Sequence, residues 1–281
     1  MLTHVLNGFA YGGLLFLVTV GLVFLFGLRR IVNFAHGGLF MIGAYVGYSV
    51  TQAAGFWAGV VCSTLVLAAV GILLDRIVFR PLAEEDPIAT VLVTFGLLIV
   101  LEDVARTVWG KGMLALEPPA GLAGVMSIAD SAYPTYRLAL VALALAVAGT
   151  LSLWLRFSRT GLYVRALSAD PLTTGMQGVN TERLSATVVA IGTGLAGLSG
   201  TVAAPLLTIS PNMGSSILVQ SFIVVVVGGL SSFSGAFIAA MVVGQLHNFG
   251  LVYVPWAASM LPFLLMIIVL IARPNTLSGA S

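Results

Sequence analysis

Long apolar runs separated by short polar interruptions dominate the chain. Between Arg183 and Arg273 there is no Lys, Arg, Asp or Glu, and the interval is rich in Gly. A helix that crosses the hydrocarbon core of a bilayer needs about 20 mostly apolar residues. The pattern therefore predicts an all-α protein, a polytopic transmembrane helical bundle of about nine membrane segments that include broken helices. The predicted segments are residues 5–27, 31–50, 56–79, 88–109, 137–155, 184–206, 217–230, 233–250 and 256–272.

Composition agrees with this pattern. Charged residues make up 8% of the 281 and hydrophobic residues 59%, whereas a soluble domain carries about 25% charge. We expect one transmembrane domain over residues 1–281. The single cysteine, Cys62, has no partner for an internal disulfide, and the first apolar run lacks the basic flank and the cleavage site of a signal peptide, so it predicts a retained helix.

The arginines sort the loops between the predicted segments. They lie at or just after the ends of the first, third, fifth and ninth segments, at positions 29, 30, 76, 80, 156, 159, 165, 183 and 273. Cytoplasmic loops of membrane proteins carry an excess of Lys and Arg. If all these arginines face the cytoplasm, the amino terminus is outside, the carboxyl terminus is inside and the number of crossings is odd, as nine is. Loop 110–136 is then external and loop 156–183 cytoplasmic.

Two stretches are unsuited to simple spans. Residues 31–40 place Asn33 and His36 beside a Gly pair, and residues 224–235 contain a second Gly pair. Such breaks free backbone groups that lipid cannot satisfy, so they are tolerated where protein or water covers them, as along a transport pathway. The candidates for a translocation pathway or gate are Asn33, His36, Gly37, Gly228 and Gly229. Alternatively, the glycines serve only close helix packing and His36 ties two helices together. The similar placement of the two breaks predicts a weak internal repeat.

The segment between the fifth and sixth predicted spans is basic and also apolar. Leu162, Val164, Leu167 and Met176 accompany its arginines, and Gly and Asp-Pro punctuation predicts short helices joined by turns. This composition fits a docking surface for another protein. It equally fits an amphipathic helix lying on anionic lipid, and composition alone leaves both possibilities open.

The motifs resemble one family. Residues 27–45, Gly-Leu-Arg-Arg-Ile-Val-Asn-Phe-Ala-His-Gly-Gly-Leu-Phe-Met-Ile-Gly-Ala-Tyr, are similar to the signature of the LivH-type permeases of branched-chain amino acid ABC importers. Three further stretches agree over nearly the whole chain: Arg159-Thr-Gly161 with Arg165-Ala166, Asp170 and Gly178-Val-Asn180; Leu195 to Gly200; and Val227 to Leu230 with Ser234-Gly235. The chain departs from the family at Gly38 and Leu172, where acidic residues are common.

The resemblance implies a multi-pass permease subunit of a bacterial inner membrane. Its expected partners are a LivM-like second permease, two ATP-binding subunits, a periplasmic substrate-binding protein and membrane lipid, with no nucleic acid. It implies that residues 156–180 contain the coupling helices that dock on an ATPase, with Arg159, Gly161, Arg165, Ala166, Asp170 and Gly178 at the coupling site. By this resemblance we expect no catalytic residue, metal or cofactor in this chain. It lacks a Gly-x-x-x-x-Gly-Lys-Ser/Thr loop and so cannot hydrolyse ATP by that route, and the partner subunits would bind ATP and Mg.

Branched-chain or related amino acids are the family's default cargo, and urea, amides and carboxylic acids are carried by similar permeases. Two other functions compete with an importer. Glu102 and Arg106 have i,i+4 helical spacing beside Asp103, which an ion-coupled secondary transporter could use. Gly197-Leu-Ser-Gly200 with His247 resembles the rhomboid intramembrane proteases, in which Ser199 would be the nucleophile and His247 its base.

Overall fold

Helices account for most of the chain. The computed structural model describes residues 1–29, 33–128 and 131–272, so Arg30, Arg273 and the start of the predicted segment at residue 31 lie outside the described residues. The α-helices of the described part are α1 (Leu2–Arg29), α2 (Ala35–Ala54), α3 (Phe56–Leu74), α4 (Pro87–Trp109), α5 (Thr135–Phe157), α6 (Arg159–Ala169), α7 (Pro171–Met176), α8 (Thr181–Ala203), α9 (Met213–Gly228), α10 (Phe233–Tyr253) and α11 (Leu261–Ala272). A π-helix (Asp75–Phe79) extends α3, and 3₁₀ turns cover Pro81–Glu84 and Pro255–Ala257.

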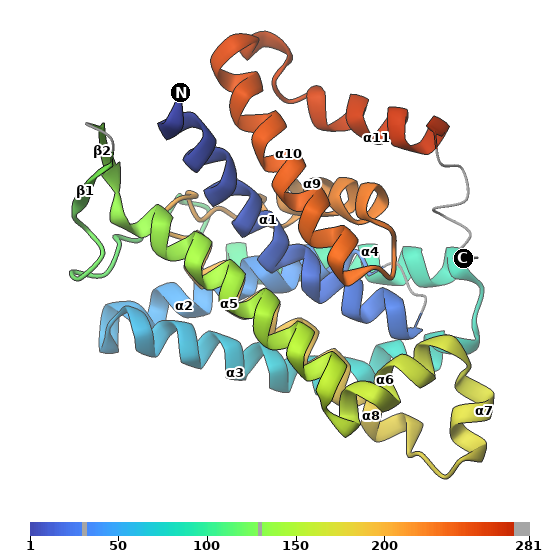
Figure 1. Cartoon of the computed structure of the whole chain (residues 1–281). Helices are drawn as coiled ribbons and strands as arrows, with labels where there is room; N and C mark the ends of the chain where they lie inside the picture. Colours follow the sequence, from blue (N-terminus) through green and yellow to red (C-terminus); the bar gives the residue numbers. More distant parts are fainter. Residues whose placement is uncertain (30–32, 129–130, 273–281) are drawn as a thin grey trace.

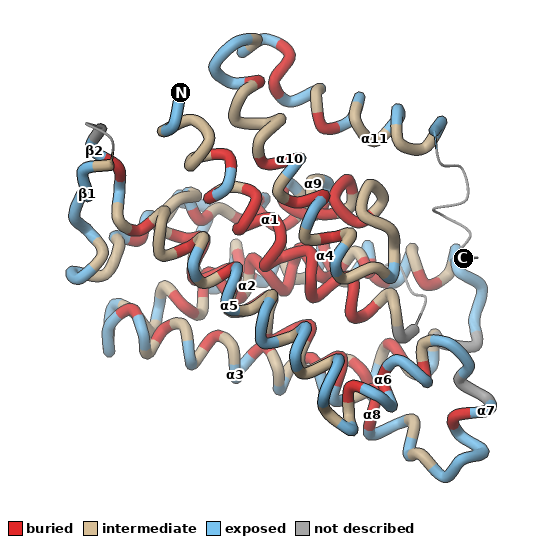
Figure 2. Tube along the Cα trace, in the orientation of Figure 1, coloured by how far each residue is buried: buried red, intermediate tan, exposed pale blue. Residues whose placement is uncertain are grey.

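Helix α1 lies at the centre of the bundle. It packs against α5, α8, α9 and α10, and the buried positions cluster on it, as Figures 1 and 2 show. Consecutive residues Leu14, Leu15, Phe16, Leu17 and Val18 are all buried. A helix that is apolar on every side is stable only where protein or lipid surrounds it completely. The uniform hydrophobicity of the first segment therefore corresponds to a core helix.

Helices α2, α3 and α8 approach one another closely through small residues. A Cβ added to Gly197 would lie 2.5 Å from the Ser63 carbonyl oxygen, and one added to Gly200 would lie 2.2 Å from the Phe40 carbonyl oxygen. The Thr201 hydroxyl donates to Ser63 Oγ at 2.7 Å and lies 3.1 Å from the Gly43 carbonyl oxygen. Small residues that let helix backbones meet are typical of packing in membranes. Gly197 and Gly200 of α8 thus serve close helix packing.

The bundle has two distinct ends. The arginine-rich end carries Arg76, Arg80, Arg156, Arg159, Arg165 and Arg183 together with α6 and α7. The hairpin end carries the start of α1 and a two-stranded antiparallel hairpin, β1 (Val125–Ile128) and β2 (Ser131–Pro134). This hairpin, within the predicted external loop, is an addition to the all-α prediction. Before the hairpin, the same loop is joined to the chain between α8 and α9 by a backbone bridge between Leu114 and Ile209.

Each of the nine predicted segments overlaps a helix. In the described residues, six helices are long and apolar enough to cross a membrane: α1, α3 with its π-helix, α4, α5, α8 and α10. Helices α9 and α11 are apolar but shorter, and α2 does not belong to the six. The structure therefore establishes a polytopic helical membrane protein, while nine crossings and their orientation remain predictions.

Candidate functional site

The first turn of α2 is buried deep inside the bundle. Asn33 Oδ1 accepts a hydrogen bond from the Ala35 amide at 3.0 Å, which satisfies one of the free donors at the start of the helix. His36 Nε2 donates to the Val18 carbonyl oxygen at 2.9 Å. Val18 lies about 16 Å along the helix axis from the Arg29 end of α1. The break predicted near residue 33 is thus a helix that begins beside the middle of α1.

Polar atoms at this helix start are buried and incompletely paired. Asn33 is 1% exposed and His36 is fully buried. Among the described residues, neither Asn33 Nδ2 nor His36 Nδ1 has a hydrogen-bond partner, and the same holds for Thr19 Oγ1 on the facing helix α1. A buried donor or acceptor without a partner costs about 1–3 kcal/mol. The unpaired polar atoms distinguish this helix start from an ordinary packed core, and its role in a pathway or gate stays a prediction.

Gly37 brings the starts of α2 and α9 together. A Cβ added to Gly37 would lie 2.3 Å from the Gly214 carbonyl oxygen, and one added to Gly38 would lie 2.8 Å from Leu101 of α4. Position 38 therefore faces apolar side chains of α4. The helices α1, α4 and α9 thus surround the first turn of α2.

The second Gly pair lies elsewhere. Gly228 packs on Gly235, where an added Cβ would be 2.6 Å from that residue's carbonyl carbon, and Gly229 turns the chain between α9 and α10 with φ +95°. Along α9, Gly214 and Gly228 are about 21 Å apart. The structure consequently places the two groups of predicted pathway residues at opposite ends of α9 and does not bring them into one cluster.

The predicted coupling segment forms two short helices, α6 and α7, at the arginine-rich end. Ser158 Oγ accepts from the Gly161 amide at 2.8 Å and so caps α6. Gly161 itself faces inward, because a Cβ there would lie 2.4 Å from the Trp154 carbonyl oxygen of α5. Val164 and Leu167 are also buried. The apolar face of α6 is thus covered by protein, which argues against the lipid-surface alternative for that face.

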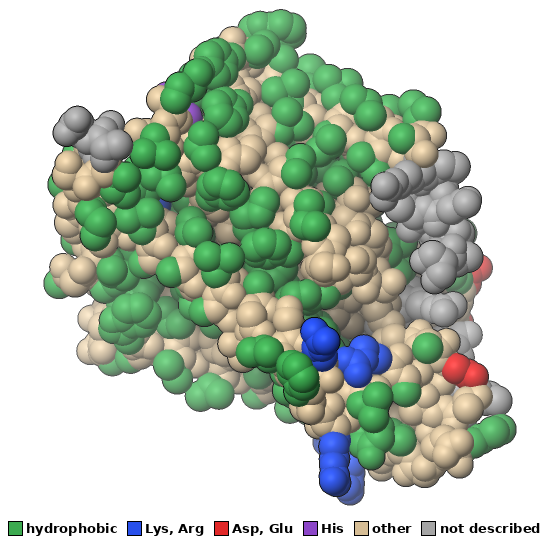
Figure 3. Space-filling view, in the orientation of Figure 1, with side chains coloured by type: hydrophobic (Ala, Val, Ile, Leu, Met, Phe, Trp, Pro, Cys, Tyr) green, Lys and Arg blue, Asp and Glu red, His purple; other side chains and the backbone are tan. Residues whose placement is uncertain are grey.

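The other face of this segment is open. Arg159, Arg165, Ala166 and Asp170 are exposed, and arginines gather over α6 and the end of α5 in Figure 3. Arg165 Nη1 donates to the Leu155 carbonyl oxygen, which anchors that side chain to α5. Exposed apolar side chains of the same segment are Phe157, Leu162, Tyr163 and Met176. A mixed basic and apolar surface of this kind is suited to binding another protein.

The turn after α6 is fixed locally. Asp170 Oδ1 accepts from the Thr173 amide at 3.1 Å at the start of α7, which includes Leu172. Gly178 has φ +79°, a conformation that favours glycine, and Asn180 Oδ1 accepts from the Arg183 amide at 2.9 Å at the start of α8. Asp170 and Gly178, two of the predicted coupling residues, are exposed and also fix the local shape of the segment.

One ionic cluster was not predicted. Arg80 Nε donates to Asp75 Oδ2 at 2.9 Å and Arg80 Nη1 to Glu182 Oε2 at 2.8 Å, so the arginine links α3 and its π-helix to α8. The hydrogen bond that Arg80 donates to the Asp75 carboxylate raises the pKa of the guanidinium above its ordinary value. Asp75 is fully buried. The available sequence signal was this isolated acid near the end of an otherwise apolar span.

Comparison of the chain with known proteins identifies its family. The family described as "Branched-chain amino acid transport system / permease component" matches residues 4–270. The chain belongs to this permease family. It is similar to the high-affinity branched-chain amino acid transport system permease proteins LivH of Salmonella typhimurium (strain LT2) and LivH of Escherichia coli (strain K12), each 25% identical over 99% of this chain and 95% of the relative. It is 27% identical to BraD of Pseudomonas aeruginosa, with the same coverage. No solved structure matches.

The permease has a further polar group near the hairpin end of α4. Arg106 Nη2 lies 3.6 Å from Glu102 Oε2, as their i,i+4 spacing predicts, and donates to Asn212 Oδ1 of the chain before α9 at 2.7 Å. The pair therefore fastens α4 to the start of α9. Glu102 lies about 10 Å and Arg106 about 5 Å along α4 from the helix end at Trp109, so the pair is nearer that end than the other.

The residues of the protease alternative contact different helices of the permease. Ser199 is fully buried, and its hydroxyl donates to the Ala196 carbonyl oxygen of its own helix at 3.0 Å. His247 stacks on Tyr11 of α1, with ring centroids 4.6 Å apart. Among the described residues, Ser199 and His247 share no hydrogen bond, although a nucleophile and its base require one.

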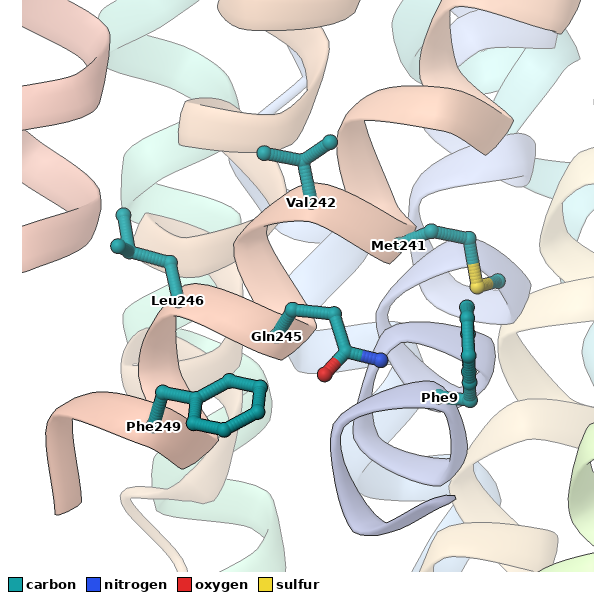
Figure 4. A pocket seen from close by; sticks show the side chains of 6 residues that line it. All are labelled: Phe9, Met241, Val242, Gln245, Leu246 and Phe249. Carbon is teal, nitrogen blue, oxygen red and sulfur yellow. The ribbon is translucent and has the colours of Figure 1, made fainter. Parts of the chain in front are cut away.

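An apolar pocket of about 430 Å³ opens between α1 and α10 of the permease, lined by Phe9, Met241, Val242, Gln245, Leu246 and Phe249 (Figure 4). Its one polar lining side chain, Gln245, donates to the Val5 carbonyl oxygen at 2.9 Å. Neither the first turn of α2 nor the coupling segment contributes to this lining. The family and the apolar helices together make the chain a multi-pass protein of a bacterial inner membrane.

Proposed function

We propose that this chain is the membrane-spanning subunit of an ATP-driven ABC importer for branched-chain or related amino acids. The observation that carries the proposal is the family match, which spans residues 4–270 and so includes the coupling segment as well as the bundle. The three relatives are named as branched-chain amino acid transport permease proteins. Urea, short amides and carboxylic acids are the alternative cargoes.

The arginine-rich end faces the cytoplasm in this proposal. Of the described positions that carry a basic side chain, most lie at this end, whereas Arg106, Lys111 and Arg137 lie toward the hairpin end. The positive-inside bias favours this orientation. It places the amino terminus and the hairpin outside, the end of α11 inside, and α6 and α7 where an ATPase can reach them. Nine crossings would fit this arrangement.

The chain works with partners. A LivM-like second permease would complete the pathway, a periplasmic binding protein would deliver the solute at the hairpin end, and two ATP-binding subunits would dock on α6 and α7. ATP and Mg would be bound by those subunits, and this chain would catalyse no reaction. Its surface otherwise meets membrane lipid, and nucleic acid is no partner.

Transport would follow from movement of the coupling segment. Closure of the ATPases on ATP would displace α6 and α7, and because α6 packs on α1, α5 and α8, these helices would shift with it. The first turn of α2 lies between α1, α4 and α9, so a shift of α1 would change the surroundings of Asn33 and His36. These two polar side chains would then face the solute pathway or form its gate.

The test is purification of the tagged chain from its native membrane, followed by mass spectrometry. We expect an ATPase and a second permease to copurify with the wild type. Less ATPase should copurify with the double variant Gly161→Asp/Arg165→Glu, because these substitutions disturb the packing of α6 on α5. Gly149→Ala on α5, where no heavy atom lies within 4 Å of the added Cβ, is the control. A chain that is repeatedly recovered alone would contradict the proposal and favour a carrier.

Cargo is tested separately. The purified assembly, reconstituted in proteoliposomes with its binding protein, should take up labelled leucine only when ATP is supplied to the ATPase side. Urea, an amide and a carboxylic acid are offered in parallel. Uptake of one of these without leucine uptake would replace the proposed substrate class but keep the importer.

A further inference from the structure

The π-helix at the end of α3 sets the geometry of the ionic cluster. The Arg80 amide donates to the Asp75 carbonyl oxygen at 2.9 Å, a bond between residues five apart. In a regular α-helix, residues five apart point about 140° away from each other. The wider π turn instead brings the two side chains together, and π turns inside helices are frequent at functional sites.

Arg80 uses its planar guanidinium to join two elements. One edge binds the buried Asp75 carboxylate through Nε at 2.9 Å. The remaining nitrogens bind Glu182 twice, at 2.8 Å to the carboxylate and at 3.3 Å to the backbone carbonyl oxygen. Ser185 Oγ of the same helix donates to Asp75 Oδ1 at 3.4 Å. A rigid, multiply bonded arginine is suited to holding two segments at a fixed relative position.

The position of this cluster in the chain is informative. Glu182 lies in the first turn of α8, two residues after Asn180, where the predicted coupling segment ends. Farther along the two helices, α3 and α8 are closely packed. A Cβ on Gly71 would clash with Thr193 Oγ1, and the Thr201 hydroxyl donates a hydrogen bond to Ser63 Oγ at 2.7 Å. Displacement of the first turn of α8 would therefore move α3 as well.

We propose that Arg80, held by Asp75, is a positioning residue that fastens the exit of the coupling segment at Glu182 to the α3–α8 pair, so that movement of the docked ATPases reaches the membrane helices. This inference rests on the proposed importer function. The cluster lies outside the exposed docking surface and outside the first turn of α2. Its role is to transmit displacement, not to contact ATPase or solute.

The test compares the number of solute molecules transported per ATP hydrolysed in the reconstituted full assembly. We expect Arg80→Gln and Glu182→Gln each to lower this ratio at least about fivefold, the lower range of measured coupling between sites. The double variant should lower it no further than the single variants, because one contact is lost in all three. Arg76→Gln, which removes the same charge from an exposed position of the same π-helix, is the control and should leave the ratio unchanged.

The possible results distinguish a cluster that transmits ATPase movement to the membrane helices from one that only anchors helix ends. Recovery of the assembled complex is measured by size-exclusion chromatography for every variant. The inference would be overturned by an unchanged number of solute molecules transported per ATP, or by an equal fall of that number in Arg76→Gln. It would also be overturned if transport, ATP hydrolysis and the amount of assembled complex fell in parallel, because the cluster would then only anchor helix ends. Failure of the proposed function is distinguishable, because the wild type itself would then show no ATP-dependent uptake; the inference would fall with it.

Discussion

Gly37 of α2 and Gly214 of α9 meet backbone to backbone. A Cβ on Gly37 would lie 2.3 Å from the Gly214 carbonyl oxygen, and one on Gly214 would lie 2.8 Å from the Gly37 carbonyl oxygen. Neither residue has room for a side chain unless a helix moves. The contact therefore fixes how closely two helix starts approach within the bundle, beside the polar side chains Asn33 and His36.

Substitution at this contact should destabilise the protein. We expect Gly37→Ala to cost about 1–3 kcal/mol through overpacking, because the obstructing atom belongs to the backbone. Thermal unfolding in detergent, followed by fluorescence-detected size-exclusion chromatography, measures the effect. Gly96→Ala on α4 is the control, since no heavy atom lies within 4 Å of its added Cβ. Equal thermal unfolding midpoints for the two variants would show that α9 moves away from the added methyl group with no loss of stability.

Gly161 should matter for docking through its position and not through contact with the partner. In Gly161→Ala the new Cβ would lie 2.4 Å from the Trp154 carbonyl oxygen, so α6 must move away from α5. We expect severalfold less ATPase to copurify and a matching loss of ATP-driven uptake. Gly149→Ala, on an open face of α5, should behave as the wild type. If a normal amount of ATPase copurified with Gly161→Ala, the packing of α6 on α5 would have no role in docking.

Thr201 should stabilise the α2–α3–α8 contact through its hydroxyl. Thr201→Val keeps the shape but removes the bonds to Ser63 Oγ and to the Gly43 carbonyl oxygen. Hydrogen bonds between membrane helices are worth about 0.5–2 kcal/mol, so we expect a lower unfolding midpoint by a corresponding amount. Thr187→Val removes only a bond within α8, from an exposed position, and serves as the control. The hydroxyl of Thr201 would be dispensable if both variants unfold together.

The Glu102–Arg106 pair distinguishes an importer from an ion-coupled carrier. We expect uptake by Glu102→Gln to remain dependent on ATP and insensitive to an uncoupler, because the pair fastens α4 to the chain before α9. The stability change should be small, about 0.3–0.5 kcal/mol, as for an i,i+4 ion pair with one partly exposed member. Asp103→Asn, the exposed neighbour, is the control. Ion coupling would be supported instead if an uncoupler abolished uptake by the wild type and if Glu102→Gln showed no uptake.

Hydropathy predicted the helices well because lipid imposes a simple requirement on length and composition. Every predicted segment overlaps a helix, and the two short helices of the coupling segment were expected from its Gly and Asp-Pro punctuation. The β hairpin was not expected, since residues 110–136 have no strong alternation of polar and apolar positions. The internal repeat stays a prediction.

The site was less predictable, because its geometry depends on contacts between distant residues. Asn33 and His36 were identified as polar residues at a break, but only the fold places them beside the middle of α1. Gly37 and Gly228 were grouped as one pathway, whereas α9 separates them. The pairing of Asp75 with Arg80 was missed because a spacing of five predicts no contact in an α-helix, and the π turn that creates it has no sequence signature.

The central position of α1 has a consequence for synthesis. This helix is synthesised before α8, α9 and α10, which cover much of its surface. Until those three helices are made, lipid or another protein must cover the faces of α1 that they later bury. Translation that stops before α8 would leave a fragment whose core helix is exposed, a natural target for membrane quality control.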